Sequence, residues 1–184
     1  MACCCPSQLL DGEHYSVLVY LRPTRLIYVR EKGPYELAIP RAWERLFAWL
    51  SENGLYATVG RGYGLARDNP EEVGAQNCRY DAAVEVPAEL RSGSIRDLGF
   101  ATLPAGPYAR RRVAGSYDRL RSLVANIYTE FVPFTGLSFD RRRPVISIYV
   151  DNPDRHAESD LRADICVPVM TEEDIRRPKI VETA

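Results

Sequence analysis

The stretch at 146–169, ISIYVDNPDRHAESDLRADICVPV, repeats the pattern of an earlier stretch at 63–86, YGLARDNPEEVGAQNCRYDAAVEV. Each has an apolar run, then Asp-Asn-Pro, then a polar segment, and then Arg-x-Asp at the start of a second apolar run. Asp and Asn form local side-chain turns, and Pro cannot continue a strand ladder. Each stretch therefore predicts two strands joined by a turn, and the duplication predicts an internal repeat.

The repeat extends upstream of these two stretches. The Asp-Asn-Pro triplets begin at Asp68 and Asp151, and two Gly-x-Tyr triplets with nearly the same offset begin at Gly33 and Gly115. A strand-like segment precedes each Gly-x-Tyr triplet, RLIYVREK in the first half and YARRRVA in the second. A helical pattern follows each triplet, so both halves predict the element order β-α-β-β.

Apolar residues recur at helical spacing after each Gly-x-Tyr triplet, and we expect these stripes to pack into the core. They are Ile39, Trp43, Leu46, Phe47 and Leu50 in the first half, and Leu120, Leu123, Val124, Ile127 and Phe131 in the second. Gly54 suits a left-handed cap at the end of the first helix. In the second half Asp118 suits the positive helix start, and Pro133 ends the pattern.

Two copies of one unit predict an α+β fold with pseudo-twofold symmetry. One unit alone buries too little surface, whereas two can form one continuous antiparallel sheet with two helices on one face. A cleft between the halves is then the natural ligand site. We expect a mobile tail over 1–14, a domain over 15–170 with halves 15–90 and 97–170, and a polar tail over 171–184.

The composition excludes several classes of function. Net charge is −1, so no basic excess holds nucleic acid, and no apolar run is long enough to span a bilayer. The first residues lack the features of a secretory signal, which predicts a cytoplasmic protein. Consecutive Cys3, Cys4 and Cys5 do not have zinc-ligand spacing, and we interpret them as part of the tail. Cys78 and Cys166 are interpreted as small core residues. Phosphate-loop and nucleophile-elbow motifs are absent from the sequence. We predict neither a metal nor a cofactor.

The ordered and duplicated motifs resemble the GyrI-like, or bacterial effector-binding, domain superfamily over roughly residues 16–169. The segments that carry the resemblance are YVREKGPYELAIPRAWERLFAWLSENGL, GLARDNP with CRYDAAVEVP, LPAGPYARRRVAGSY, IYVDNP and LRADICVPV. The resemblance implies a tandem β-α-β-β domain that holds amphipathic small molecules between its halves. It also implies a free-standing member, because no segment here matches the DNA-binding module to which such domains are often fused.

The same resemblance points to a pocket carboxylate. Family members commonly hold a buried glutamate on the last strand, where this sequence has Asp164. In a pocket, Asp164 would pair with a cationic ligand or, in a hydrolase, activate water. Alternatively, Asp164 is a structural residue that pairs with an arginine. For Asp81, the repeat partner of Asp164, this structural role is favoured.

Aromatic residues supply the other candidates for ligand binding. Tyr63 and Tyr149 lie in the strands before each Asp-Asn-Pro and are candidate cleft walls. Tyr35 and Tyr117 belong to the Gly-x-Tyr triplets, where they either line the cleft or pin the strand-to-helix junction. Trp49 and its repeat partner Phe131 lie on helix flanks, where an aromatic ring reaches a cleft or packs into the core.

Three functions stay open at this point. The first is a stand-alone binding protein for amphipathic aromatic ligands, with a cationic ligand as one version. The second is a hydrolase that detoxifies cyclopropane-bearing alkylators with Asp164 as the pocket carboxylate. The third is an interaction with a protein partner, such as modulation of gyrase. The sequence does not decide the ligand or the oligomeric state.

Overall fold

The computed structural model describes residues 17–88, 90, 98–130 and 137–171. Phe131, Pro133, Cys3, Cys4, Cys5 and nearly all of the two expected tails lie outside these residues. The described helical segments are α1 (Tyr35–Glu52), α2 (Pro70–Val73), α3 (Tyr117–Glu130) and the short 3-10 turns η1 (Ala75–Asn77) and η2 (Glu158–Asp160). The described strands are β1 (Val17–Leu21), β2 (Arg25–Lys32), β3 (Gly62–Ala66), β4 (Arg79–Glu85), β5 (Gly99–Thr102), β6 (Gly106–Ala114), β7 (Leu137–Phe139), β8 (Val145–Tyr149) and β9 (Arg162–Thr171).

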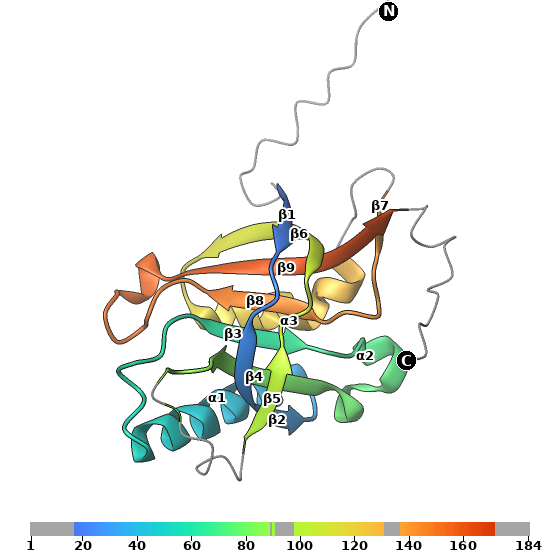
Figure 1. Ribbon diagram of the computed structural model, residues 1–184. Coiled ribbons are helices and arrows are strands. Elements are labelled where there is room, and N and C mark those ends of the chain that lie inside the picture. Colours follow the sequence, from blue (N-terminus) through green and yellow to red (C-terminus); the bar gives the residue numbers. More distant parts are fainter. Residues whose placement is uncertain (1–16, 89, 91–97, 131–136, 172–184) are drawn as a thin grey trace, which may run out of the picture.

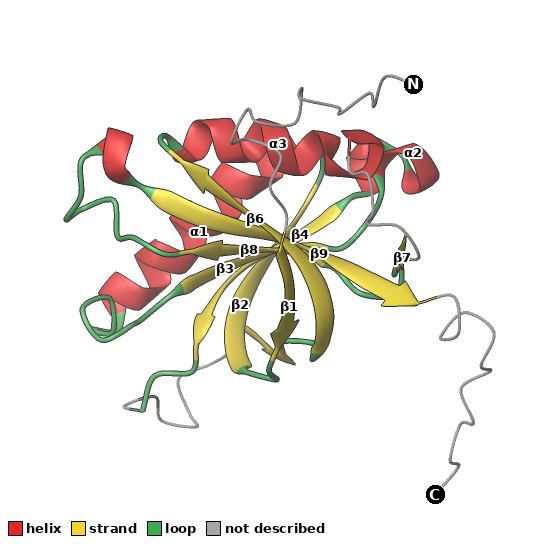
Figure 2. Cartoon of the chain, turned by 90° about the horizontal axis from the view of Figure 1, so that it is seen from above, coloured by secondary structure: helices red, strands yellow, loops and turns green. Residues whose placement is uncertain are grey.

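The described strands form a sheet of nine antiparallel-paired members in the order β1-β6-β9-β8-β3-β4-β2-β5, with β7 beside β9. The long helices α1 and α3 lie on the same side of this sheet, as Figures 1 and 2 show. The two halves run β2-α1-β3-β4 and β6-α3-β8-β9 along the chain. The predicted α+β fold with tandem repeats, two helices on one face and pseudo-twofold symmetry is therefore confirmed.

The strands that precede the two halves are exchanged between them. β1 comes before the first half in the sequence but pairs with β6 of the second, Val19 opposite Tyr108. β5 comes before the second half but pairs with β2 of the first, Ile27 opposite Phe100. Each half of the sheet is thus completed by a strand from the segment that leads into the other half.

The repeated Asp-Asn-Pro motif fixes the turn that joins the last two strands of each half. The Asp68 carboxylate accepts hydrogen bonds from the Arg79 backbone N–H at 2.8 Å and from its guanidinium at 2.8 and 2.7 Å. Asp151 binds the same three groups of Arg162, each at 2.9 Å. Asn69 accepts from the Glu71 N–H as a helix N-cap, and proline occupies the first helical position. The motif recurs because both halves need the same turn.

Helix α1 ends as its sequence predicts. Gly54 adopts a φ of +67° and its N–H donates to the Ser51 carbonyl at 3.1 Å, while the Leu55 N–H donates to the Leu50 carbonyl at 2.8 Å. This bonding pattern is a Schellman motif, which requires a left-handed residue at the position of Gly54.

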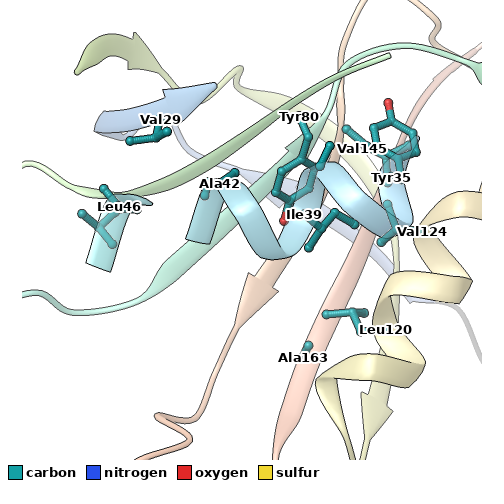
Figure 3. Packing of buried hydrophobic residues seen from close by; sticks show 14 of the residues in the cluster. Val29, Tyr35, Ile39, Ala42, Leu46, Tyr80, Leu120, Val124, Val145 and Ala163 are labelled. Atoms are coloured by element: carbon teal, nitrogen blue, oxygen red, sulfur yellow. The ribbon is translucent and has the colours of Figure 1, made fainter. Parts of the chain in front are cut away.

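The main core lies between the helices and the sheet. Figure 3 shows Val29 beside Ala42 and Leu46 at one end, and Leu120 over Ala163 at the other. Leu46 is fully buried, which contributes about 1.5–3 kcal/mol. A second, smaller cluster occupies the other face of the sheet; its buried members are Leu26, Tyr63, Leu65, Ala83, Leu103, Tyr108, Ile146 and Cys166.

Candidate functional site

A cavity of about 680 Å³ lies on the helix side of the sheet, between the two halves. Its walls come from the middle of α1, the segment 56–62, the start of α3, and the segment 149–156 that leads out of β8. Ligand pockets commonly measure about 300–1,000 Å³, so this cavity has the size of a small-molecule site.

Five aromatic side chains form a continuous chain along the cavity. The ring of Tyr149 packs edge to face against Tyr117 and Trp43, with ring centroids 4.9 Å apart in both pairs. Trp43 then contacts Phe47 at 5.2 Å, and Phe47 contacts Tyr56 at 5.5 Å. Such pairs contribute about 0.5–1.5 kcal/mol beyond area burial. The aromatic wall is therefore a fixed surface that spans both halves of the fold.

A chain of buried hydroxyls lies at the base of this wall. Trp43 Nε1 donates to Tyr80 Oη at 3.2 Å, and Tyr80 Oη lies 3.2 Å from Tyr149 Oη. Burial raises the pKa of both tyrosines, because desolvation disfavours the phenolate. Gly64 lies directly beneath, and an added Cβ there would overlap the Tyr80 hydroxyl. The hydroxyl chain is thus neutral and depends on a glycine in β3.

Tyr117 joins the cavity wall to the repeated turn. Its hydroxyl donates to the Asp151 carbonyl at 2.7 Å, as Tyr35 does to Asp68 in the first half, also at 2.7 Å. Burial raises the pKa of Tyr117 to about 12. The bonds from Arg162 lower the pKa of the Asp151 carboxyl to about 2, so Asp151 is ionised at neutral pH and paired with the Arg162 guanidinium.

The repeat predicts a second, equivalent site in the other half, but different residues occupy it. Ala66 stands there in place of Tyr149, and Ala125 in place of Trp43. The Tyr128 hydroxyl donates to the Ala66 carbonyl at 3.3 Å, and its ring packs on Phe139 with centroids 5.2 Å apart. A side chain from α3 thus occupies the space beside Ala66, and the symmetry of the fold is broken where the cavity forms.

Asp164 lies on the other face of the sheet. Ala163 and Ile165 belong to the core beneath the helices, while Cys166 belongs to the opposite cluster, so strand alternation turns Asp164 away from the cavity. Its carboxylate accepts two hydrogen bonds from Arg112, at 2.7 and 2.8 Å. The structure does not bring Asp164 together with the aromatic wall, and its geometry is that of the structural alternative.

Its repeat partner Asp81 has the same arrangement. Asp81 is fully buried and binds Arg30 through two hydrogen bonds at 2.6 and 2.9 Å, and it also pairs with Arg67. The two carboxylates therefore have the same structural role. Each links two adjacent strands on the sheet face opposite the helices.

The other sequence candidates divide between the two faces and the core. Tyr149 and Tyr117 line the cavity. Tyr63 lies on the opposite face, where its hydroxyl donates to Glu85 at 2.7 Å. Tyr35 is buried in the core and pins the strand-to-helix junction, and Trp49 packs partly buried against that core. Phe131 lies outside the described residues.

Sequence reasoning missed three aromatic members of the wall. The helical stripe predicts core positions for Trp43 and Phe47, and no sequence pattern singles out Tyr56. In the structure Ala38 and Ala42 are buried on α1, and Trp43 and Phe47 remain partly exposed beside the stripe. The sequence signal that could have found them is the pair Ala38 and Ala42, four positions apart. Small residues at this spacing indicate the side of the helix that packs closest to the sheet, so Trp43 and Phe47 lie beside that contact.

The described residues contain no group of three or more His, Cys, Asp or Glu side chains arranged to hold a metal ion. Within the same part of the chain, no helix combines the length and the apolar character that crossing a bilayer requires.

A two-half α+β sheet with an aromatic cavity between its helices defines a class of small-molecule-binding domain. The chain belongs to the GyrI-like small molecule binding domain family, because the model of that family matches residues 16–170.

Sequence relatives support the same family. A DNA gyrase inhibitor from Serratia proteamaculans (strain 568) is 32% identical over 114 residues, which cover 61% of this chain and 72% of that protein. A DNA gyrase inhibitor from Cronobacter sakazakii (strain ATCC BAA-894) is 30% identical over 149 residues, which cover 76% of this chain and 86% of that protein.

Solved structures share the fold at low sequence identity. The EcmrR C-terminal domain has a TM-score of 0.63 at 17% identity and covers 85% of this chain and 98% of that one. SAV2435 bound to tetraphenylphosphonium has a TM-score of 0.57 at 13% identity and covers 85% of this chain and 94% of that one. At such identities the likeness establishes the fold alone.

Proposed function

We propose that this protein binds amphipathic aromatic small molecules in the cavity between α1 and α3. The observation that carries the proposal is the aromatic wall from Tyr117 to Tyr56, which lines a cavity of about 680 Å³ in a chain of the GyrI-like small molecule binding family. Aromatic and apolar walls with a few polar groups are the usual lining of such sites. A role in drug or toxin sensing would follow from binding of this kind.

The chain offers a direct test because its two tryptophans lie in different places. Trp43 lines the cavity, whereas Trp49 packs beside the core and does not line it. We expect an aromatic ligand to change the fluorescence of Trp43. The variant Trp49→Phe should therefore keep the response, and Trp43→Phe should lose it.

Tetraphenylphosphonium, the molecule bound to SAV2435, is one probe, and neutral aromatic compounds of similar size are the others. Calorimetry on the same samples separates binding from a purely optical effect. A response that persists in Trp43→Phe and disappears in Trp49→Phe would place the ligand elsewhere and contradict the proposal.

A second candidate function comes from the sequence relatives. The two relatives described above carry the name DNA gyrase inhibitor, at 30–32% identity. We therefore propose interaction with gyrase as the alternative role. A supercoiling assay with purified gyrase tests it: slower supercoiling at increasing concentrations of this protein supports the role, and an unchanged rate contradicts it.

The hydrolase hypothesis depends on Asp164 as the pocket carboxylate. A general base must reach the reacting water through a hydrogen bond. Asp164 does not line the cavity, and its two oxygens accept from Arg112. The observations favour binding over hydrolysis, and incubation of the protein with a strained alkylator, followed by product analysis, tests this directly.

A further inference from the structure

The three carboxylates that line the cavity already have partners. Asp118 pairs with Arg121, and the Asp154 carboxylate accepts a hydrogen bond from the Tyr56 hydroxyl. Asp151 binds Arg162 through two hydrogen bonds to the guanidinium and one to the backbone. A cationic ligand would therefore have to compete with contacts that the protein itself supplies.

Two arginines at the same cavity, by contrast, have no partner among the described residues. Arg61 lies just before β3, and Arg155 lies in the turn after β8, so they approach the cavity from different halves. Among the described residues, neither guanidinium has a hydrogen bond or an ion pair. Both residues are exposed and belong to the cavity lining. The charge of Arg61 also acts on Tyr63 of the opposite face, so the Arg61 side chain must turn to meet a bound molecule.

The buried hydroxyls beside the cavity are bonded in a defined direction. Trp43 Nε1 can only donate, so Tyr80 Oη accepts that bond and keeps its own proton to place. Tyr80 is almost fully buried, and within the described chain the acceptor in reach is Tyr149 Oη at 3.2 Å. A buried hydroxyl without an acceptor is unfavourable, so Tyr80 donates to Tyr149. Tyr80 therefore does not accept the Tyr149 proton.

We infer that the preferred ligand is an aromatic molecule with an anionic oxygen group, such as an aryl carboxylate. This inference rests on the proposed function and adds the charge of the ligand. Among the described residues, Arg61 and Arg155 are cavity-lining donors without a partner, whereas each of the three carboxylates has at least one. The aromatic part packs along the wall formed by Trp43 and Phe47, while the anionic oxygens bind the two arginines.

Three probes of nearly equal shape test the charge: naphthoate, naphthamide and naphthylmethylammonium. Their affinities are measured by calorimetry, and Trp43 fluorescence in the Trp49→Phe background reports occupancy of the cavity. We expect naphthoate to bind roughly fivefold to tenfold more tightly than naphthamide, the size that partly exposed charge pairs support. The ammonium compound should bind most weakly, and added salt should reduce the naphthoate affinity selectively.

The double variant Arg61→Gln with Arg155→Gln should lose the preference for naphthoate and keep the affinity for naphthamide within about twofold. Arg22→Gln is the matched control, because Arg22 is an exposed arginine between β1 and β2 that does not line the cavity. Tighter binding of the ammonium compound, equal binding of all three, or an unchanged preference in the double variant would overturn the inference alone. Absence of binding by all three probes and by tetraphenylphosphonium, with Trp43 unresponsive, would overturn the proposed function as well.

Discussion

Gly64 and Ser147 lie opposite each other at the centre of the sheet, paired across β3 and β8. They are also repeat equivalents, because both stand four residues before the Asp of their Asp-Asn-Pro motif. The pseudo-twofold axis of the fold therefore passes between them. Gly64 is a glycine because the Tyr80 hydroxyl lies over it and leaves no room for a side chain. The equivalent position in the other half is Ser147.

Replacement of Gly64 by alanine should destabilise the protein by about 1–3 kcal/mol, since the new Cβ would overlap the Tyr80 hydroxyl in a packed core. It should also disturb the bond from Trp43 and so weaken ligand binding. Urea unfolding measures the stability. Gly60→Ala is the control, because an added Cβ there meets no atom within 4 Å. Equal stability of the two variants would show that the hydroxyl chain does not depend on Gly64.

The two strand-linking aspartates should affect stability and leave ligand binding unchanged. Asp164→Asn removes the charge of a bidentate pair with Arg112, and we expect stability to fall by about 1.5–3 kcal/mol. Asp81→Asn should lower it by about 3–5 kcal/mol, because Asp81 is fully buried between Arg30 and Arg67.

Thermal and urea unfolding measure these changes, and calorimetry below the unfolding transition measures the affinity of the folded protein for naphthoate. If Asp164→Asn lowered the affinity for naphthoate but kept its stability, Asp164 would be a ligand-binding residue and the prediction would be wrong.

Much of the fold was predictable because it depends on local sequence patterns, and the repeat presents most of these patterns in both halves. The Asp68 and Asp151 turns, the Gly54 cap and the order β-α-β-β each depend on neighbouring residues, and each half of the repeat supports the interpretation of the other. The exchange of β1 and β5 was not predictable in this way. Strand pairing across the whole chain depends on tertiary contacts that no local pattern encodes.

The site was predicted less completely, again for a physical reason. Strand alternation groups Asp164 with Cys166, but it does not say which group faces the helices. Helix periodicity likewise places Trp43 with the apolar stripe without saying whether the edge of the stripe meets the sheet or a cavity. The repeat nominated Tyr149 together with Tyr63, and Tyr117 together with Tyr35, but it does not say which member of each pair lines the cavity.

Acid should weaken the fold through the repeated turns. The Arg162 bonds hold the pKa of Asp151 at about 2, below its ordinary value of 3.8. A carboxyl whose folded pKa is lowered stabilises the fold fully above its unfolded pKa, and this stability is lost as pH falls through the folded pKa. Wild-type stability should therefore decline between about pH 4 and pH 2, and Asp151→Asn should decline less steeply.

Urea unfolding at several pH values in this range measures the slope. Arg79 lowers the pKa of Asp68 in the equivalent turn, so the double variant with Asp68→Asn should flatten the profile further. A slope in the double variant that equals the wild-type slope would exclude these two pairs as the source of acid sensitivity.

Tyr149 should separate the roles of ring and hydroxyl at the cavity. Tyr149→Phe keeps the ring contacts with Trp43 and Tyr117 but removes the acceptor of the buried Tyr80 hydroxyl, so we expect stability to fall by about 1–3 kcal/mol. Its affinity for naphthamide should stay close to the wild-type value.

Tyr149→Ala removes the centre of the aromatic wall, so calorimetry should show weaker binding of all three naphthyl probes, by about 0.5–1.5 kcal/mol for each aromatic pair that the ring of Tyr149 would form with the probe. Tyr63→Ala is the matched control, because Tyr63 is a buried tyrosine of the neighbouring strand β3 that packs on the opposite face of the sheet. It should reduce stability, since it leaves a cavity in the smaller cluster, and yet bind the probes with wild-type affinity while folded. If Tyr63→Ala weakened binding as much as Tyr149→Ala does, the ligand would lie on the face of Asp164, and the cavity between α1 and α3 would not be the site.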